Sequence, residues 1–222
     1  MTELQNNKIG ISIQVGLSGY SFKIYDNEGV KPSGWMAPER LFSSPQMQHR
    51  YDEVEISVFT PKFALVPKQF YNAASAREML GEVADLSAVD SVESVAVPQF
   101  ASVLLYSDNT GGSLPRVIAE MVMKTDGNKV SPLPEIYYML SALDAIGEYN
   151  KIMASYMDGE LYLVIAQGKS LLLCNINKSS INQETSIILW NTLETRSKPR
   201  DFFIFINNIF FFSLVFSFFF FR

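Results

Sequence analysis

Few residues of this sequence have the type and spacing that chemistry requires. The turn Asn109-Thr110-Gly111-Gly112-Ser113 precedes a predicted helix, and glycines at a helix N-terminus let a phosphate approach the backbone N–H groups. The turn lacks the lysine and the spacing of a P-loop, so we favour a plain turn and helix start. Tyr137, Tyr138 and Tyr149 could stack on a ligand ring, but such residues more often pack with the polar tip at the surface.

Carboxylates and metal-ligating side chains are equally sparse. Glu82, Asp85, Asp90 and Glu93 lie close together in the chain and could hold a hard cation, but they lack regular ligand spacing. We expect a solvated acidic surface there, not a metal site.

The single cysteine and the single histidine add little chemistry. Cys174 ends the apolar run Leu171-Leu172-Leu173-Cys174 and is interpreted as a buried small hydrophobe, while His49 lies in a polar loop. No Gly-x-Ser-x-Gly, Gly-x-Gly-x-x-Gly or His-Glu-x-x-His motif occurs. The sequence therefore predicts no catalytic residue and no metal ligand.

Composition limits the class of protein. Apolar residues make up 48% and charged residues 18% of the 222 residues, which is typical of a globular core. A net charge of −5 argues against nucleic-acid binding, because a phosphate-backbone binder needs a concentrated basic face. The polar N-terminus has no apolar signal core, so we expect a cytoplasmic protein. We also expect a protein partner, which the sequence does not identify.

The elements that must position any site are short strands and helices. Alternating apolar residues and a Leu17-Ser18-Gly19 turn predict a β-hairpin over residues 9–26. A loop follows over residues 31–50. The remaining pattern predicts strands over 54–59, 63–66, 91–97 and 101–107, helices over 72–86, 113–122 and 134–149, and a meander over 152–156, 161–166 and 169–175.

Two hairpin units of one plan, about 140 residues apart, suggest internal duplication. This arrangement resembles the actin-like ATPase fold, a duplicated form of the ribonuclease-H-like architecture. The stretches 58–67 and 150–175 further resemble an uncharacterised Bacteroidetes family of unknown function, and this resemblance implies a bacterial source. The resemblance covers residues 9–175 and implies a mixed α/β scaffold, with a first half over 1–150 and the start of a second half over 151–175.

The resemblance also implies a place for a nucleotide. In working members the first hairpin carries Asp-x-Gly, with the Asp near the nucleotide's metal, whereas Gln14-Val15-Gly16 occupies that place here. In the second unit the comparable position falls near Ser155. The site equivalents that the resemblance implies are Gln14, Gly16, Ser18, Gly19, Asp158 and Gly159. A neutral amide is a poor Mg²⁺ ligand, so the leading interpretation is a non-catalytic binding module, with an ATP- and Mg²⁺-dependent ATPase or sugar-kinase-like enzyme as the alternative.

The end of the chain changes character. Residues 176–201 are polar and irregular, and residues 202–221 are almost wholly apolar and rich in Phe. Twenty such residues would span a bilayer as a helix, which predicts a tail anchor with the preceding domain on the cytoplasmic side. The rival interpretation, which we favour, is a truncated or frame-shifted end that leaves the second half incomplete.

Overall fold

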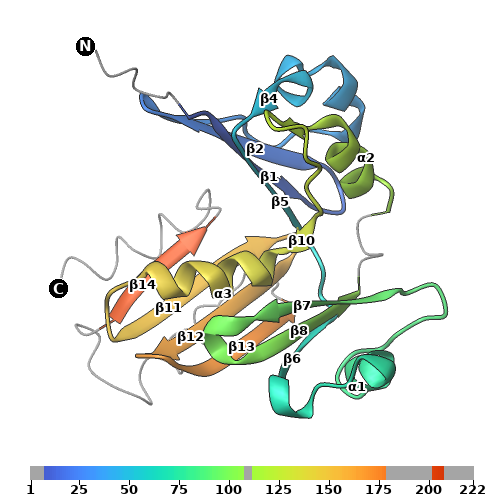
Figure 1. Ribbon diagram of the computed structural model, residues 1–222, viewed down its shortest axis with the longest axis vertical. Coiled ribbons are helices and arrows are strands. Elements are labelled where there is room, and N and C mark those ends of the chain that lie inside the picture. Colours follow the sequence, from blue (N-terminus) through green and yellow to red (C-terminus); the bar gives the residue numbers. More distant parts are fainter. Residues whose placement is uncertain (1–7, 108–111, 179–201, 208–222) are drawn as a thin grey trace. The chain divides into compact units, whose positions relative to one another are not determined.

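The computed structural model describes residues 8–107, 112–178 and 202–207 (Figure 1). Contacts divide the chain into two compact units. Unit 1 comprises Met1–Lys62, Asp85–Glu93 and Tyr106–Glu135, and unit 2 comprises Phe63–Ala84, Ser94–Leu105 and Ile136–Arg222. This spatial division is interleaved along the chain, and a boundary between halves at residue 150 stays a prediction from the sequence.

Unit 1 contains a mixed five-stranded sheet of order β10-β5-β1-β2-β3. Its strands are β1 (Gly10–Val15), β2 (Tyr20–Asp26), β3 (Gly29–Pro32), β5 (Glu53–Val58) and β10 (Leu133–Pro134). The predicted hairpin is confirmed, because β1 runs antiparallel to β2. On its other side β1 runs parallel to β5, which in turn pairs in parallel with β10.

The core of unit 1 lies on one face of this sheet. Ile11, Ile13 and Val15 of β1 are buried there, and Ser12 and Gln14 occupy the other face, which is the period-two alternation expected of a half-buried strand. Helix α2 (Leu114–Met121) packs against this apolar face through the buried Ile118.

The expected loop over residues 31–50 is more ordered than its composition suggested. It contains the 3-10 helices η1 (Pro38–Ser43) and η2 (Pro45–Gln48) and begins the short strand β4 (Arg50–Tyr51), which pairs with β9 (Met123–Lys124). The buried residues Leu41, Met47 and Tyr51 hold this segment against the core. Their spacing follows neither a helical nor a strand period, so local pattern missed them.

Unit 2 repeats the plan of the first sheet with order β13-β12-β11-β14. Its strands are β11 (Asn150–Met157), β12 (Glu160–Gln167), β13 (Ser170–Lys178) and β14 (Phe202–Asn207). In unit 2, β11, β12 and β13 form an antiparallel meander, and β14 then pairs in parallel with β11. In unit 1, β1, β2 and β3 form the same kind of meander, and β5 then pairs in parallel with β1. The repeated order confirms the duplication that the two hairpin units predicted.

The remaining elements are a sheet of order β6-β8-β7 and short helices. They are β6 (Phe63–Pro67), η3 (Lys68–Phe70), η4 (Ala73–Ser75), α1 (Ala76–Gly81), β7 (Val92–Val97), η5 (Pro98–Phe100), β8 (Ser102–Ser107) and α3 (Glu135–Ala145). The helix predicted over 72–86 is therefore shorter and starts with a 3-10 turn. Its predicted cap is correct, because Asn72 Oδ1 accepts from Ala74 N at 3.0 Å.

The apolar tail is described only at its start. Phe202–Asn207 forms strand β14, which pairs in parallel with β11, where we expected the start of a helix. Within the described residues, no helix combines the length and apolar character needed to cross a membrane. Residues 179–201 and 208–222 lie outside the described part, so the anchor and the out-of-frame end both stay predictions.

Candidate functional site

The carboxyl edge of the unit 1 sheet gathers the strand ends that could bind a ligand. Val15 of β1 pairs with Val58 of β5, and Val58 pairs with Pro134 of β10, so the three parallel strands end in register. Phe59 N continues the ladder by donating to Val15 O at 2.8 Å. Ligands of open α/β sheets bind beyond such carboxyl ends, which makes this edge the candidate site.

The turn from β1 to β2 forms one side of this edge. Gly16 N donates to Gly19 O at 2.9 Å and closes the turn, while Ser18 is exposed at its tip. Tyr20 N donates to Met36 O at 2.9 Å and Met36 N donates to Tyr20 O at 2.7 Å, which binds the 33–37 segment against the turn. A Cβ at Gly19 would overlap Met36 O, so this close approach requires glycine.

Gln14 belongs to a neutral row of side chains across the sheet. In register it lies between Ser21 of β2 and Ser57 of β5, and Ser57 pairs in turn with Leu133 of β10. This row has amide and hydroxyl groups but no carboxylate. It is therefore a weak donor set for Mg²⁺, which is bound through carboxylates and phosphates.

Glu135 is a residue of this edge that the sequence analysis missed. It directly follows β10, is the first residue of α3, and is only 4% exposed. A carboxylate in the first turn of a helix is favoured by the helix dipole. The sequence signal for Glu135 is its place between an apolar strand and a helix. From the sequence alone, this signal predicts only the start of the helix.

The second hairpin places Asp158 and Gly159 in a tight turn. Met157 pairs with Glu160, so these two residues alone connect β11 to β12. Both have positive φ, 51° at Asp158 and 82° at Gly159, as a type I′ turn requires. Ser155, the residue nearest the implied carboxylate position, is fully buried and pairs with Tyr162.

The six implied site equivalents thus fall into two groups. Gln14, Gly16, Ser18 and Gly19 share one hairpin of unit 1, and Asp158 and Gly159 share one turn of unit 2. Their role in binding a nucleotide stays a prediction.

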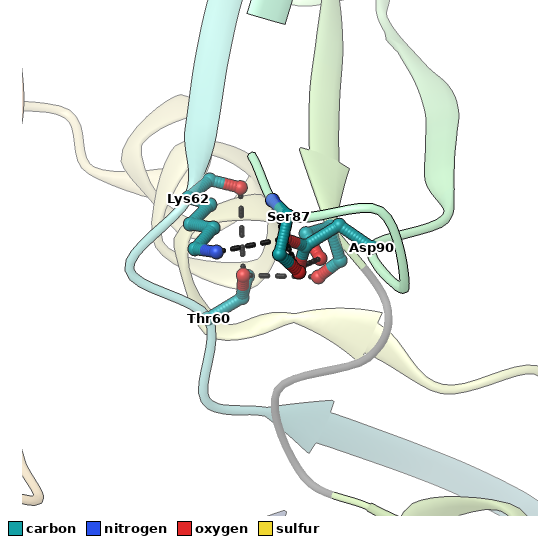
Figure 2. Close-up of polar contacts among 5 residues, drawn as sticks. Thr60, Lys62, Ser87 and Asp90 are labelled. Carbon is teal, nitrogen blue, oxygen red and sulfur yellow. Dashed lines mark hydrogen bonds and ion pairs between the residues drawn. The ribbon is translucent and has the colours of Figure 1, made fainter. Parts of the chain in front are cut away.

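The predicted acidic surface divides into exposed and buried members. Glu82, Asp85 and Glu93 are exposed as expected, but Asp90 is only 8% exposed, so the prediction was wrong for that residue. Figure 2 shows the contacts of Asp90 with Lys62 and Ser87, and it shows Thr60 nearby. The Lys62 ammonium, with N–H and hydroxyl donors from its neighbours, holds the pKa of the Asp90 carboxyl well below its usual range.

The other residues singled out in the sequence have structural neighbours. His49 contacts the Tyr51 ring edge-on, with centroids 5.2 Å apart. Tyr137 and Tyr138 contact each other in the same manner at 5.5 Å, and burial raises the pKa of the Cys174 thiol to about 12. Asn109, Thr110 and Gly111 lie outside the described residues. Over the part of the chain that the structure describes, no three His, Cys, Asp or Glu side chains gather as metal ligands would.

Solved structures identify the class of fold. A Bacteroides thetaiotaomicron protein with an actin-like ATPase fold and unknown function is similar with a TM-score of 0.61 and 15% identity, over 87% of this chain and 80% of that one. An exopolyphosphatase from Cytophaga hutchinsonii and the PPX-GPPA enzyme of Aquifex aeolicus are more distant, with TM-scores of 0.38 and 0.34 at 9% identity. The match to the exopolyphosphatase covers 85% of this chain and 60% of that protein, and the match to the PPX-GPPA enzyme covers 82% of this chain and 56% of that protein. The similarity to the Bacteroides thetaiotaomicron protein shows that the chain has the actin-like ATPase fold, as the hairpin units predicted.

The family follows from the sequence match. Residues 1–195 match the family described as "Protein of unknown function (DUF3822)", and the chain belongs to that family. No curated protein matches it.

Proposed function

We propose that this chain is a non-catalytic binding or interaction module on an actin-like scaffold. The observation that supports this proposal is the neutral row Gln14, Ser21 and Ser57 beside the β1–β2 turn. A working nucleotide site needs a carboxylate for its metal at Gln14, and the second hairpin has Ser155 at the comparable place. The side chains at both places do not fit Mg²⁺ as a resident cofactor.

The partner we propose is a protein. The net charge of −5 disfavours nucleic acid, and attachment to a membrane would rest on the 202–221 tail alone. A carbonate wash of membranes from expressing cells tests the tail: retention that is lost when the chain stops at Arg200 would support an anchor, and release of the full chain would exclude it.

The experiment that tests the main proposal is thermal unfolding with and without millimolar Mg-ATP. A ligand at 100 times its Kd stabilises the folded state by about 2.7 kcal/mol, which raises the Tm of a domain of this size by roughly 5–11 °C. We expect no such shift and no release of phosphate. Mg²⁺-dependent ATP turnover that is abolished by Gly16→Val would contradict the proposal.

A second candidate function is a nucleotide-dependent enzyme, and Glu135 is the observation that favours it. This buried carboxylate stands at the same sheet edge as Gly16 and Phe59, so the edge does hold one acidic group. The enzyme interpretation predicts that Glu135→Gln removes turnover while nucleotide-induced stabilisation remains. Absence of both effects in the unaltered chain would leave the binding module as the better account.

A further inference from the structure

The shortest segment of unit 1 contains a buried charge. Unit 1 is assembled from three stretches of chain, of which Asp85–Glu93 is the shortest. Asp90 is its buried residue, whereas Val89 is 75% exposed. The segment contributes no residue to the apolar cluster around β1, β2 and β5. Apolar burial in that cluster therefore does not hold it in place.

Asp90 reaches both of the other stretches. Its Oδ2 accepts from Lys62 Nζ at 2.8 Å, and its Oδ1 accepts from Ser107 Oγ at 2.7 Å. Two further bonds are local, since Oδ2 also accepts from Ser87 N at 2.6 Å and from Ser87 Oγ at 2.8 Å (Figure 2). Bonds to an ionised carboxylate are stronger than neutral ones, so this one side chain is a strong point of attachment.

The other two stretches are joined independently of Asp90. Ser107 N donates to Lys62 O at 3.0 Å, and Thr60 Oγ1 donates to Ser107 O at 3.0 Å. Release of Asp90 therefore leaves the Thr60–Lys62 stretch bonded to Ser107, with the apolar core untouched.

We propose that Asp90 is a clamp and that the segment Asp85–Glu93 opens as a unit when the clamp releases, while the rest of unit 1 stays folded. Segments held by few apolar contacts open at a lower free energy than the whole domain. The last two residues of the segment, Val92 and Glu93, are the first two of β7, an edge strand of the β6-β8-β7 sheet, so opening of the segment frees the start of that edge.

Hydrogen exchange with mass spectrometry on the full chain tests the clamp. Asp90→Asn and Lys62→Met each remove the ion pair, and we expect the amides of residues 85–93 to exchange roughly tenfold faster or more. Amides of β1, β2 and β5 stay protected, because their exchange still requires the rest of unit 1 to unfold. Lys31→Met is the matched control, because it removes an exposed Lys–Asp pair of 3.3 Å and should leave residues 85–93 unchanged.

Two results would overturn the clamp. Unchanged exchange over residues 85–93 in both variants would show that other contacts hold the segment. Loss of protection over the core strands together with residues 85–93, or failure of both variants to fold, would show that Asp90 holds unit 1 as a whole and not one segment.

Discussion

Gly19 is the position where one methyl group should disturb the candidate edge most directly. In Gly19→Ala the new Cβ overlaps Met36 O, so the pair of hydrogen bonds between Tyr20 and Met36 must lengthen or break. Two backbone bonds are worth about 1–3 kcal/mol net, and the alanine offsets about 0.4–1 kcal/mol by restricting the unfolded chain. We expect a loss of about 1–2 kcal/mol in the free energy of unfolding, measured by urea denaturation, and a Tm lower by roughly 2–8 °C.

Gly147→Ala is the control for this prediction. Gly147 has no positive φ and nothing within 4 Å of an added Cβ, so the same change should be neutral or slightly stabilising. If Gly19→Ala is as stable as Gly147→Ala, the 33–37 segment does not depend on its close approach to the turn, and the geometric reasoning fails.

Four further predictions concern single groups. Asp158→Ala should cost about 1 kcal/mol because of its positive φ and Asp158→Gly should not, so a matching loss in both would point to a role for the carboxylate beyond the turn. Because the pKa of Asp90 is lowered in the folded chain, its carboxylate stabilises the fold above the unfolded pKa of about 3.9, and this stability is lost as the pH falls below that value. Urea titrations at low pH should show the free energy of unfolding falling with pH in the natural chain, and this contribution should be missing in Asp90→Asn. Burial is the main cause that raises the pKa of Tyr25 to about 12, with smaller contributions from Glu55 and Glu53. The unfolded chain therefore loses this proton at lower pH than the folded chain, so the free energy of unfolding should fall between about pH 10 and 12 in the natural chain but not in Tyr25→Phe. Burial also raises the pKa of Cys174 to about 12, so a thiol reagent at pH 8 should modify the folded chain far more slowly than the urea-unfolded chain.

Local pattern was sufficient for the hairpins and for the duplication. Alternating apolar residues and glycine turns are properties of neighbours in the chain, so β1, β2 and the β11–β13 meander followed from them. The neutral Gln14 and the turn residues Asp158 and Gly159 were equally visible, because residue type and turn chemistry need no distant partner.

Tertiary structure decided what depends on distant partners. Asp90 looked like one of four solvated carboxylates, and only the approach of Lys62 and Ser107 made it a buried ion pair. Glu135 became a candidate site residue only because β10 ends in register with β5. Phe202–Asn207 became a strand because β11 offers a parallel edge, whereas its composition alone suited a membrane helix equally well. Hydrophobicity predicts that a segment is buried, but the hydrogen-bonding partner determines in which form.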